Sequence, residues 1–534
     1  KFTWILSVVK RFSAVKCNIY NNYTLLIYII RVFMTFKMVI KIADQLTNPV
    51  QKQDPFANLL GDFGRWQFLV FGTISLVKLS SGWVQMAILF LTPNLRFRCV
   101  NLPNGTEEIQ NNTCYSGCVE YEYDASPFEN TIVSEWDLIC EKRWLASFTQ
   151  MMLQLGVLVG SVVFGFLSDR YGRKITFLVS ITAVIIFGLA IPFSPSYIVF
   201  TALRFLLGFS TAGTMVVSFV IVMESVGPRY REVTGCLFQI PFIIGHMSVP
   251  LFAYYFRTWD NYMLALGIPP LIYLGYFFTV TESPRWLVSH GKVEEATKIM
   301  KKAAIMNGRS TAKIEETLTI LSKEITKNAD AAPLNYTALF QGSLAVKTVC
   351  SLVMWLIVGV VYFGFNQYIS QTSPDPFVSV ALAGAIQIPS DIAAIWFIKT
   401  LGRRLTVSIF FILGGVFVII LYFVPKIFAL TLTLGTLGVS CAAIVATSIY
   451  VYTSELYPTV VRNMGIGACS TSMRIGSMVA PFISNTVVNY PWLPTVIFGA
   501  AGMLAGLVCL ILPETKGKSL PDSIEDLKKN ESEQ

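Results

Sequence analysis

Twelve apolar runs, each about twenty residues long, restrict this chain to folds that cross a membrane repeatedly. They lie near residues 68–91, 145–168, 175–193, 198–222, 233–255, 261–280, 346–369, 377–398, 405–423, 427–452, 464–487 and 492–512. A helix of about twenty apolar residues spans about 30 Å of hydrocarbon. The chain is 54% hydrophobic and only 14% charged, which excludes an ordinary soluble domain. We predict an all-α membrane protein with twelve transmembrane helices.

A charged stretch between the second and third runs reads GFLSDRYGRK at residues 165–174. We expect Gly165 to let two helices approach closely and Gly172 to take a positive φ in a tight turn. The basic residues predict that this turn lies on the cytoplasmic side. A generic charged loop between membrane helices is the alternative.

The landmarks of the first half recur about 230 residues later, which indicates two related six-helix halves. KTLGRR at residues 399–404 follows GFLSDRYGRK, and the ESPR run at 282–285 is echoed by PETKG at 513–517. Glu224 stands seven residues before Arg231, as Glu455 does before Arg462. Lys399 stands where Asp169 stands in the first copy. Because this acidic residue is missing, we expect the ion pairs of the second copy to be weaker.

These boundaries divide the chain into five parts. Residues 1–53 form an N-terminal extension outside the fold, with Met38 as the expected natural start, although a signal peptide or extra helix is also compatible with the apolar run at 23–36. Residues 54–280 form the first half, 281–345 a linker with amphipathic helices, 346–515 the second half and 516–534 a disordered tail.

The long loop at residues 92–144 carries four cysteines, Cys99, Cys114, Cys118 and Cys140. It also carries glycosylation sequons at Asn104 and Asn111. Together these features predict an extracellular, oxidising location with two disulfides. Three pairings are open, and free cysteines are the alternative.

Several motifs in this order resemble solute carrier family 22, the organic cation, anion and zwitterion transporters of the major facilitator superfamily. They are the cysteine-bearing loop, SEWDLIC at 134–140, GFLSDRYGRK, ESPRWL at 282–287 and ELYPTVVRN at 455–463. The stretch at 245–254 is most similar to carnitine-type and insect members. Sugar porters share ESPRWL and PETKG, but the seventh span lacks their paired glutamines.

The resemblance places a substrate site near the middle of the membrane, between the halves. Arg474 is the main candidate, because a guanidinium pairs bidentately with a carboxylate. Family members selective for cations carry aspartate at this position, whereas anion and carnitine-type members carry arginine. Asp391 stands where anion members have lysine, and Gln387 where cation members have glutamate. Arg474 and Asp391 either hold a zwitterion between them or neutralise one another, and the sequence leaves both open.

Other polar and aromatic residues of the spans are weaker candidates for the site. Lys78 either extends toward the membrane surface or attracts anions, and His246 is interpreted as a hydrogen-bonded helix residue rather than a proton carrier. The remaining candidates for lining the cavity are Tyr362, Phe363, Phe365, Gln239, Tyr450 and Tyr452.

A separate group of charges is expected to control conformation. The resemblance implies an ion-pair network at cytoplasmic helix ends that breaks as the halves rock. Its members are Asp169, Arg170, Arg173, Arg204, Glu224, Arg231, Glu455 and Arg462.

We therefore predict a plasma-membrane carrier of small organic ions that works by alternating access, with both termini cytoplasmic. Carboxylate-bearing zwitterions or anions are the preferred substrates, and organic cations are also compatible. The driving force stays open between uniport, solute exchange and coupling to sodium or protons. No cofactor, metal site or catalytic constellation is expected, and the net charge of +9 is dispersed among the spans, which argues against nucleic-acid binding. A sugar-porter-like uniporter and a non-transporting receptor are the alternatives.

Overall fold

The computed structural model describes residues 54–101, 111–115, 118–328, 336–373, 375–425, 427–458 and 461–517. The expectations for residues 1–53, for the sequon at Asn104 and for most of the C-terminal tail lie outside these ranges.

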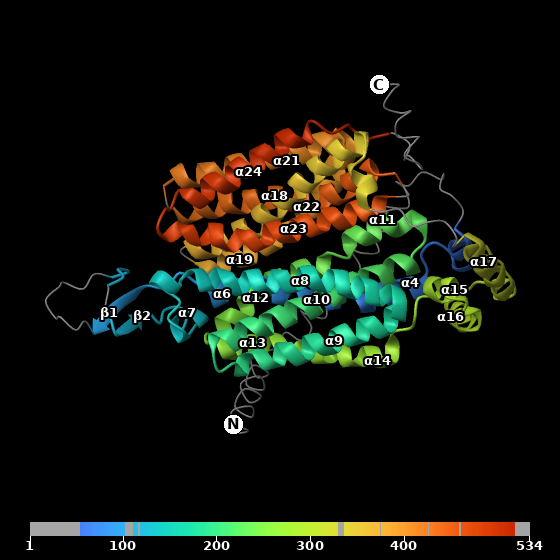
Figure 1. Ribbon diagram of the computed structural model, residues 1–534, viewed down its shortest axis with the longest axis horizontal. Helices are drawn as coiled ribbons and strands as arrows, with labels where there is room; N and C mark the ends of the chain where they lie inside the picture. The colour runs from blue at the N-terminus through green and yellow to red at the C-terminus, as the bar shows by residue number, and fades with distance from the viewer. Residues whose placement is uncertain are drawn as a thin grey trace.

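Two groups of long helices lie side by side, one from each half of the chain (Figure 1). The first group contains α4 (Arg65–Ser75), α5 (Val77–Met86), α6 (Ile88–Leu91), α8 (Trp144–Tyr171), α9 (Arg173–Ala190), α10 (Tyr197–Ser225), α11 (Pro228–Leu237), α12 (Ile240–Tyr255), α13 (Trp259–Gly267) and α14 (Tyr276–Thr279). The second contains α18 (Ser343–Thr372), α19 (Pro376–Ala385), α20 (Gln387–Leu401), α21 (Arg403–Phe423), α22 (Phe428–Leu456), α23 (Arg462–Asn485) and α24 (Leu493–Cys509).

Ten helical stretches within the described residues are long and apolar enough to cross a membrane. Helix α24 is a shorter apolar helix, and α23 is not among the ten. Polar residues, including Arg474, occupy α23. The two expected spans outside the ten are therefore helical but shorter or more polar than an ordinary membrane helix.

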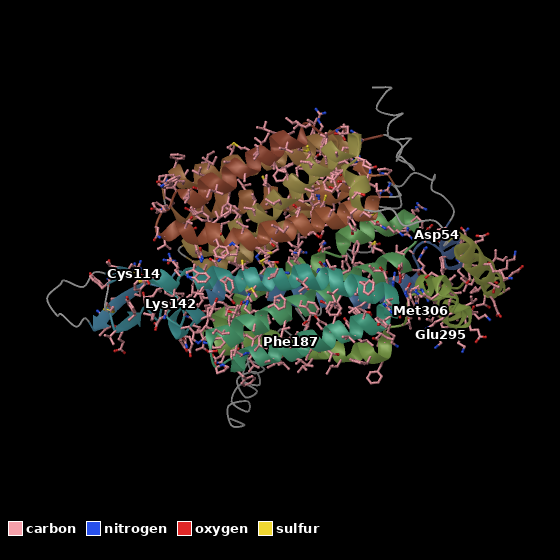
Figure 2. The ribbon with its side chains drawn as sticks, viewed as in Figure 1. Asp54, Cys114, Lys142, Phe187, Glu295 and Met306 are labelled. Carbon is pink, nitrogen blue, oxygen red and sulfur yellow. A yellow bond between two sulfur atoms is a disulfide. The ribbon has the colours of Figure 1, made fainter. Side chains whose placement is uncertain are left out.

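One end of the molecule, here called the disulfide end, carries a small sheet. Strands β1 (Phe97–Asn101) and β2 (Glu120–Tyr123) are antiparallel, with Phe97 opposite Tyr123, and helix α7 (Ile132–Glu135) follows. Disulfides join Cys99 to Cys118 and Cys114 to Cys140, one of the three pairings that the sequence leaves open. Cys114 and Lys142 mark this end in Figure 2.

The opposite end, here called the linker end, carries the short helices between the two halves. They are α15 (Pro284–Ser289), α16 (Val293–Met306) and α17 (Ile314–Asn328), packed with α3 (Pro55–Leu60). The apolar faces of α15–α17 meet Phe56 and Trp66 in one buried cluster, which explains their amphipathic sequence. Asn307 ties this cluster to the first span, because its side chain accepts from the Trp66 backbone and donates to the Leu60 carbonyl. Figure 2 labels Asp54, Glu295 and Met306 in this region.

Glycines allow the closest helix crossings in each half. A Cβ on Gly208 would lie 2.2 Å from the Leu153 carbonyl oxygen, and a Cβ on Gly476 would lie 2.0 Å from that of Leu356. Gly165 does not act this way, because nothing lies within 4 Å of its Cβ position, so our expectation of a close approach there is wrong. Gly172 has φ +104°, which confirms the expected turn conformation.

Candidate functional site

The two halves contact each other in the part of the molecule nearer the disulfide end. Phe90 of α6 stacks on Phe377 of α19, with ring centroids 5.4 Å apart. Ser147 of α8 donates to the Pro481 carbonyl of α23 at 3.0 Å and accepts from the Asn485 amide. These contacts hold α6 and α8 of the first half against α19 and α23 of the second.

A buried hydrogen-bond chain joins the halves through Gln387. Its Nε2 donates to the Ala383 carbonyl at 2.9 Å and lies 3.0 Å from Nδ1 of His246, and its Oε1 accepts from the Tyr362 hydroxyl at 2.8 Å. Because the amide nitrogen is the donor, His246 Nδ1 accepts and its proton resides on Nε2, which has no hydrogen-bond partner among the described residues. In this conformation Gln387 and Tyr362 bond within the protein, and His246 takes the hydrogen-bonded role expected from the sequence.

Arg474 and Asp391 do not neutralise one another. Among the described residues no ion pair joins them, and Asp391 Oδ1 instead accepts from the Thr447 hydroxyl at 2.7 Å. Arg474 is half-buried on α23. This conformation therefore excludes the internal salt bridge and leaves the guanidinium without a carboxylate partner in the described part of the chain.

Aromatic residues divide between the site and the helix cores. Tyr450 is 40% exposed, and its ring lies edge-on to Trp355, with ring centroids 4.4 Å apart. Phe363 is half-buried beside Tyr362. In contrast, Phe365 and Tyr452 are fully buried in core clusters, so the expectation that they line a cavity is wrong.

Lys78 is a buried cation of α5. Its Nζ lies 5.0 Å from the centre of the Phe238 ring on the segment between α11 and α12, next to the half-buried Gln239. We expected Lys78 either to snorkel or to attract anions, and it is buried rather than extended to the membrane surface.

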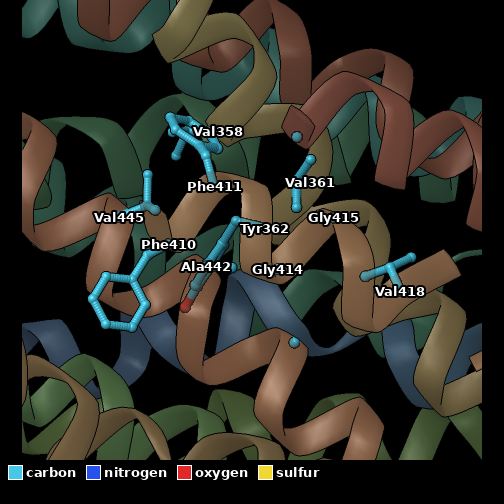
Figure 3. A pocket seen from close by; sticks show the side chains of 12 residues that line it. Val358, Val361, Tyr362, Phe410, Phe411, Gly414, Gly415, Val418, Ala442 and Val445 are labelled. Carbon is cyan, nitrogen blue, oxygen red and sulfur yellow. The ribbon is translucent and has the colours of Figure 1, made fainter. Parts of the chain in front are cut away.

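A separate apolar pocket lies inside the second half (Figure 3). Valines, phenylalanines and glycines of α18, α21 and α22 form most of its wall, with Tyr362 as its polar member. No charged residue lines it. The pocket is therefore unsuited to an organic ion and is distinct from the region around Arg474.

Charged groups at the linker end form one cluster in each half. In the first, Arg173 pairs with Asp169 and Glu224, each at 2.9 Å, and its backbone N–H donates to Glu282. In the second, Arg403 pairs with Glu455 at 2.9 Å, and its backbone N–H donates to Glu514.

The two clusters show the duplication expected from the sequence, because Arg403, Glu455 and Glu514 repeat Arg173, Glu224 and Glu282. Among the residues that the structure describes, Lys399, which stands where Asp169 does, forms no ion pair in the second cluster. Each ion pair described here joins residues of a single half.

Comparison with known proteins identifies the family. The model of the family described as "Sugar (and other) transporter" matches residues 105–526. Solute carrier family 22 member 6-A of Xenopus laevis is 34% identical over 417 residues, which cover 77% of this chain and 75% of that protein. The chain belongs to solute carrier family 22.

Other relatives cover more of the chain. The organic cation transporter-like protein of Drosophila melanogaster is 30% identical over 88% of this chain and 91% of its own length. Organic cation/carnitine transporter 2 of Mus musculus is 30% identical over 89% and 93%. The inward-open xylose transporter XylE from E. coli matches with a TM-score of 0.62 at 18% identity, covering 87% of this chain and 99% of its own, and shows the shared fold. This solute carrier family 22 chain is thus a multi-pass membrane transporter and not an enzyme.

Arg204 of this family 22 member does not belong to the linker-end clusters. It lies near the start of α10, close to the disulfide end, and is 1% exposed. Its guanidinium donates to Gln150 at 2.6 Å and lies over the Phe200 ring. Arg204 and Glu224 therefore cannot both lie at a cytoplasmic helix end as expected, because they stand near opposite ends of the same 29-residue helix.

The sequence reading missed Asp54, which caps α3 and pairs with Arg231 and Arg285 at the linker end. The Asp-Pro pair at the start of α3 is a helix-start signal that would have identified Asp54 as a capping residue.

Arg462, the counterpart of Arg231, donates to the Tyr457 carbonyl at 3.3 Å. The ring of Tyr171 lies beside Arg170, 5.7 Å from its guanidinium.

Glu514 offers a test of the second cluster in this family 22 protein. Burial raises the pKa of Glu514, but backbone N–H groups of Arg403, Lys516, Arg404 and Thr515 outweigh burial and hold its pKa below the ordinary value. A lowered pKa stabilises the fold above the unfolded value of about 4.3, and that stability is lost as the pH falls through the folded pKa. We expect Glu514→Gln to cost about 1–2 kcal/mol at pH 7, allowing for partial exposure.

Thermal unfolding of the purified protein at pH 7 and at pH 3.5 measures this effect. The difference in Tm between Glu514→Gln and wild type should shrink at the lower pH. Glu324→Gln, on the exposed face of α17, is the matched control. An equal loss of Tm at both pH values would contradict the proposed ionic origin.

Proposed function

We propose that this family 22 protein carries small organic ions across the plasma membrane, and that Arg474 anchors the carboxylate of its substrate. One observation supports this most directly. Arg474 is a half-buried guanidinium on a transmembrane helix, and no described residue supplies its counter-charge. A charge at membrane depth is costly and marks a functional site by default. The relative named as an organic cation/carnitine transporter is compatible with such a substrate.

Alternating access is the proposed mechanism. The two halves meet nearer the disulfide end, whereas the linker-end ion pairs lie within one half. This arrangement favours a state that is closed at the disulfide end. Movement of one half against the other would then open the disulfide end and close the linker end. Asp169, Arg170, Arg173, Glu224, Arg231, Glu455 and Arg462 are the proposed conformational residues.

The orientation of the protein in the membrane follows from its disulfides and its basic residues. Disulfides form in oxidising compartments, and basic residues accumulate on the cytoplasmic side of a membrane. We therefore place the disulfide end outside the cell, and the linker end and both termini in the cytoplasm. Asn111, which is exposed at the disulfide end, is then a glycosylation site.

Asp391 gives the site a way to engage an ammonium group. It is half-buried in α20 and uses one oxygen for Thr447. A zwitterion would place its carboxylate on Arg474 and its cation toward Asp391, with Tyr450 and Phe363 as aromatic surfaces. An anion would use Arg474 alone.

Uptake into proteoliposomes tests the function. We expect labelled p-aminohippurate or carnitine to accumulate above empty vesicles, and tetraethylammonium and xylose to accumulate less. Replacing sodium, changing the pH and preloading unlabelled substrate then separate ion coupling from exchange. Accumulation of xylose alone would favour a sugar uniporter, and binding without uptake of any compound would favour a receptor.

A further inference from the structure

Phe377, at the start of α19, is the point where the second half meets three aromatic rings of the first half. Its ring stacks on Phe90 of α6, with centroids 5.4 Å apart. It also lies 5.6 Å from the ring of Phe128 in the cysteine-bearing loop and 5.7 Å from the edge-on ring of Tyr254 in α12. Each such pair adds stability beyond the apolar area that it buries. These four rings, here called the aromatic clasp, hold the halves together at the disulfide end.

The local sequence fixes Phe377 at the start of its helix. Asp375 caps α19, because its side chain accepts from the backbone N–H groups of Phe377 and Val378 at 3.0 and 3.1 Å. Pro376 follows as the first helical residue, where its missing N–H costs no hydrogen bond. The ring of Phe377 therefore moves with α19, and the aromatic clasp opens when α19 moves away from the first half.

Phe128 belongs to the cysteine-bearing loop, and hydrogen bonds on both sides of it attach the loop to the first half. The Arg257 guanidinium donates to the Pro127 carbonyl at 2.9 Å, and the Arg257 carbonyl accepts from the Glu129 N–H at 3.2 Å. The same guanidinium lies 5.1 Å from the centre of the Tyr254 ring. Arg257 thus positions two of the four rings in the aromatic clasp.

The loop also packs into a buried cluster that it shares with both halves. Phe128 and Ile132 of the loop belong to this cluster, as do Tyr262 of the first half and Val380 of α19. Phe128 is only 6% exposed in this closed arrangement. Separation of α19 from the first half would expose these apolar side chains to water, which opposes opening.

We propose that the cysteine-bearing loop is part of the transport gate: through Phe128 it contacts Phe377 and holds the disulfide end closed, and Arg257 is the positioning residue for that contact. The inference rests on the alternating access of the proposed function and deepens it, because it assigns the loop a role in the conformational equilibrium. Loss of the contact should then favour the state that is open at the disulfide end.

The distance across the disulfide end measures the state of this gate. Spin labels at Pro195 of the first half and Asn489 of the second, both exposed, report that distance by double electron–electron resonance in nanodiscs. Phe377→Ala removes three ring pairs, so we expect it to raise the ratio of open to closed populations about tenfold or more. Phe128→Ala removes one ring pair with Phe377 and should raise that ratio about two- to tenfold.

Variants of Arg257 separate a positioning role from a general loss of stability. Arg257→Ala should raise the open population as Phe128→Ala does. Arg257→Lys keeps a donor for the Pro127 carbonyl and should restore the closed population, and failure to restore it rejects the role of Arg257. Tyr123→Ala is the matched control, because its ring packs on Phe97 within the small sheet of the loop and the distance should stay as in wild type.

An unchanged ratio of populations in Phe377→Ala and Phe128→Ala overturns the inference. The two variants lie in different halves, so either one decides the test if the other does not fold. If wild type accumulates no substrate in proteoliposomes, the proposed function fails instead. That outcome is distinct, because the measured distances still show whether the loop holds the disulfide end closed.

Discussion

Replacing Arg474 with alanine is expected to lower kcat/KM for carboxylate substrates by about 30- to 1000-fold, equivalent to about 2–4 kcal/mol. The guanidinium is half-buried and has no carboxylate partner among the described residues. Its removal deprives a substrate carboxylate of two charge-assisted hydrogen bonds at a depth where water cannot replace them. Arg474→Lys keeps the charge but not the planar pair of donors, so we expect an intermediate loss.

Initial rates of p-aminohippurate and carnitine uptake measure this prediction. Arg98→Ala is a matched control, because Arg98 pairs with Glu122 on the exposed sheet at the disulfide end. Both variants should purify as monodisperse protein with similar Tm. Wild-type rates for Arg474→Ala would show that the substrate carboxylate binds elsewhere.

A second large effect is expected at the crossing of α18 and α23. A Cβ on Gly476 would lie 2.0 Å from the Leu356 carbonyl oxygen, and one on Gly359 would lie 2.0 Å from that of Met473. Backbone atoms cannot rotate away as a side chain can, so the helices must separate to admit a larger residue. We expect Gly476→Val to destabilise the protein by more than about 3 kcal/mol and to reduce its yield sharply.

Gly467 provides the control on the same helix. Nothing lies within 4 Å of its Cβ position and it is exposed, so Gly467→Val should fold normally. Detergent-solubilised yield, size-exclusion profile and Tm compare the two variants. A Gly476→Val protein with the wild-type Tm would contradict the prediction, because it would mean that α18 and α23 admit a larger side chain at this crossing.

The repeated charged motifs allowed the most detailed local predictions. The positive φ of Gly172 was predicted from a tight turn, and the place of Glu455 in a charged cluster was predicted because it repeats Glu224. Such features depend on neighbours in sequence or on duplication. Both are visible without coordinates.

Residues whose role depends on which helix face they occupy were harder to predict. Gln387 and Tyr362 were expected to face substrate, yet they bond to one another and, through His246, to the other half. Phe365 and Tyr452 were expected in a cavity and are buried in cores. In an apolar span all faces have similar composition, so periodicity does not distinguish a face toward lipid, core or cavity.

Arg204 and Gly165 illustrate the same limit. Arg204 was grouped with Glu224, but the two lie near opposite ends of α10. Gly165 was expected to allow a close helix crossing, but the close crossings lie at Gly208 and Gly476. Both errors concern contacts between helices distant in the chain.

The sequence by itself determined the class of protein, the duplicated halves, the cysteine-bearing loop and the family, because apolar length, repeated motifs and composition are properties of the chain alone. Only the tertiary structure decided which polar groups meet: it paired Asp391 with Thr447 instead of Arg474, placed Lys78 beside the Phe238 ring, and joined Gln387 to Tyr362 and His246. Those pairings depend on the rotation of each helix about its axis and on its neighbours, which packing of the whole bundle sets.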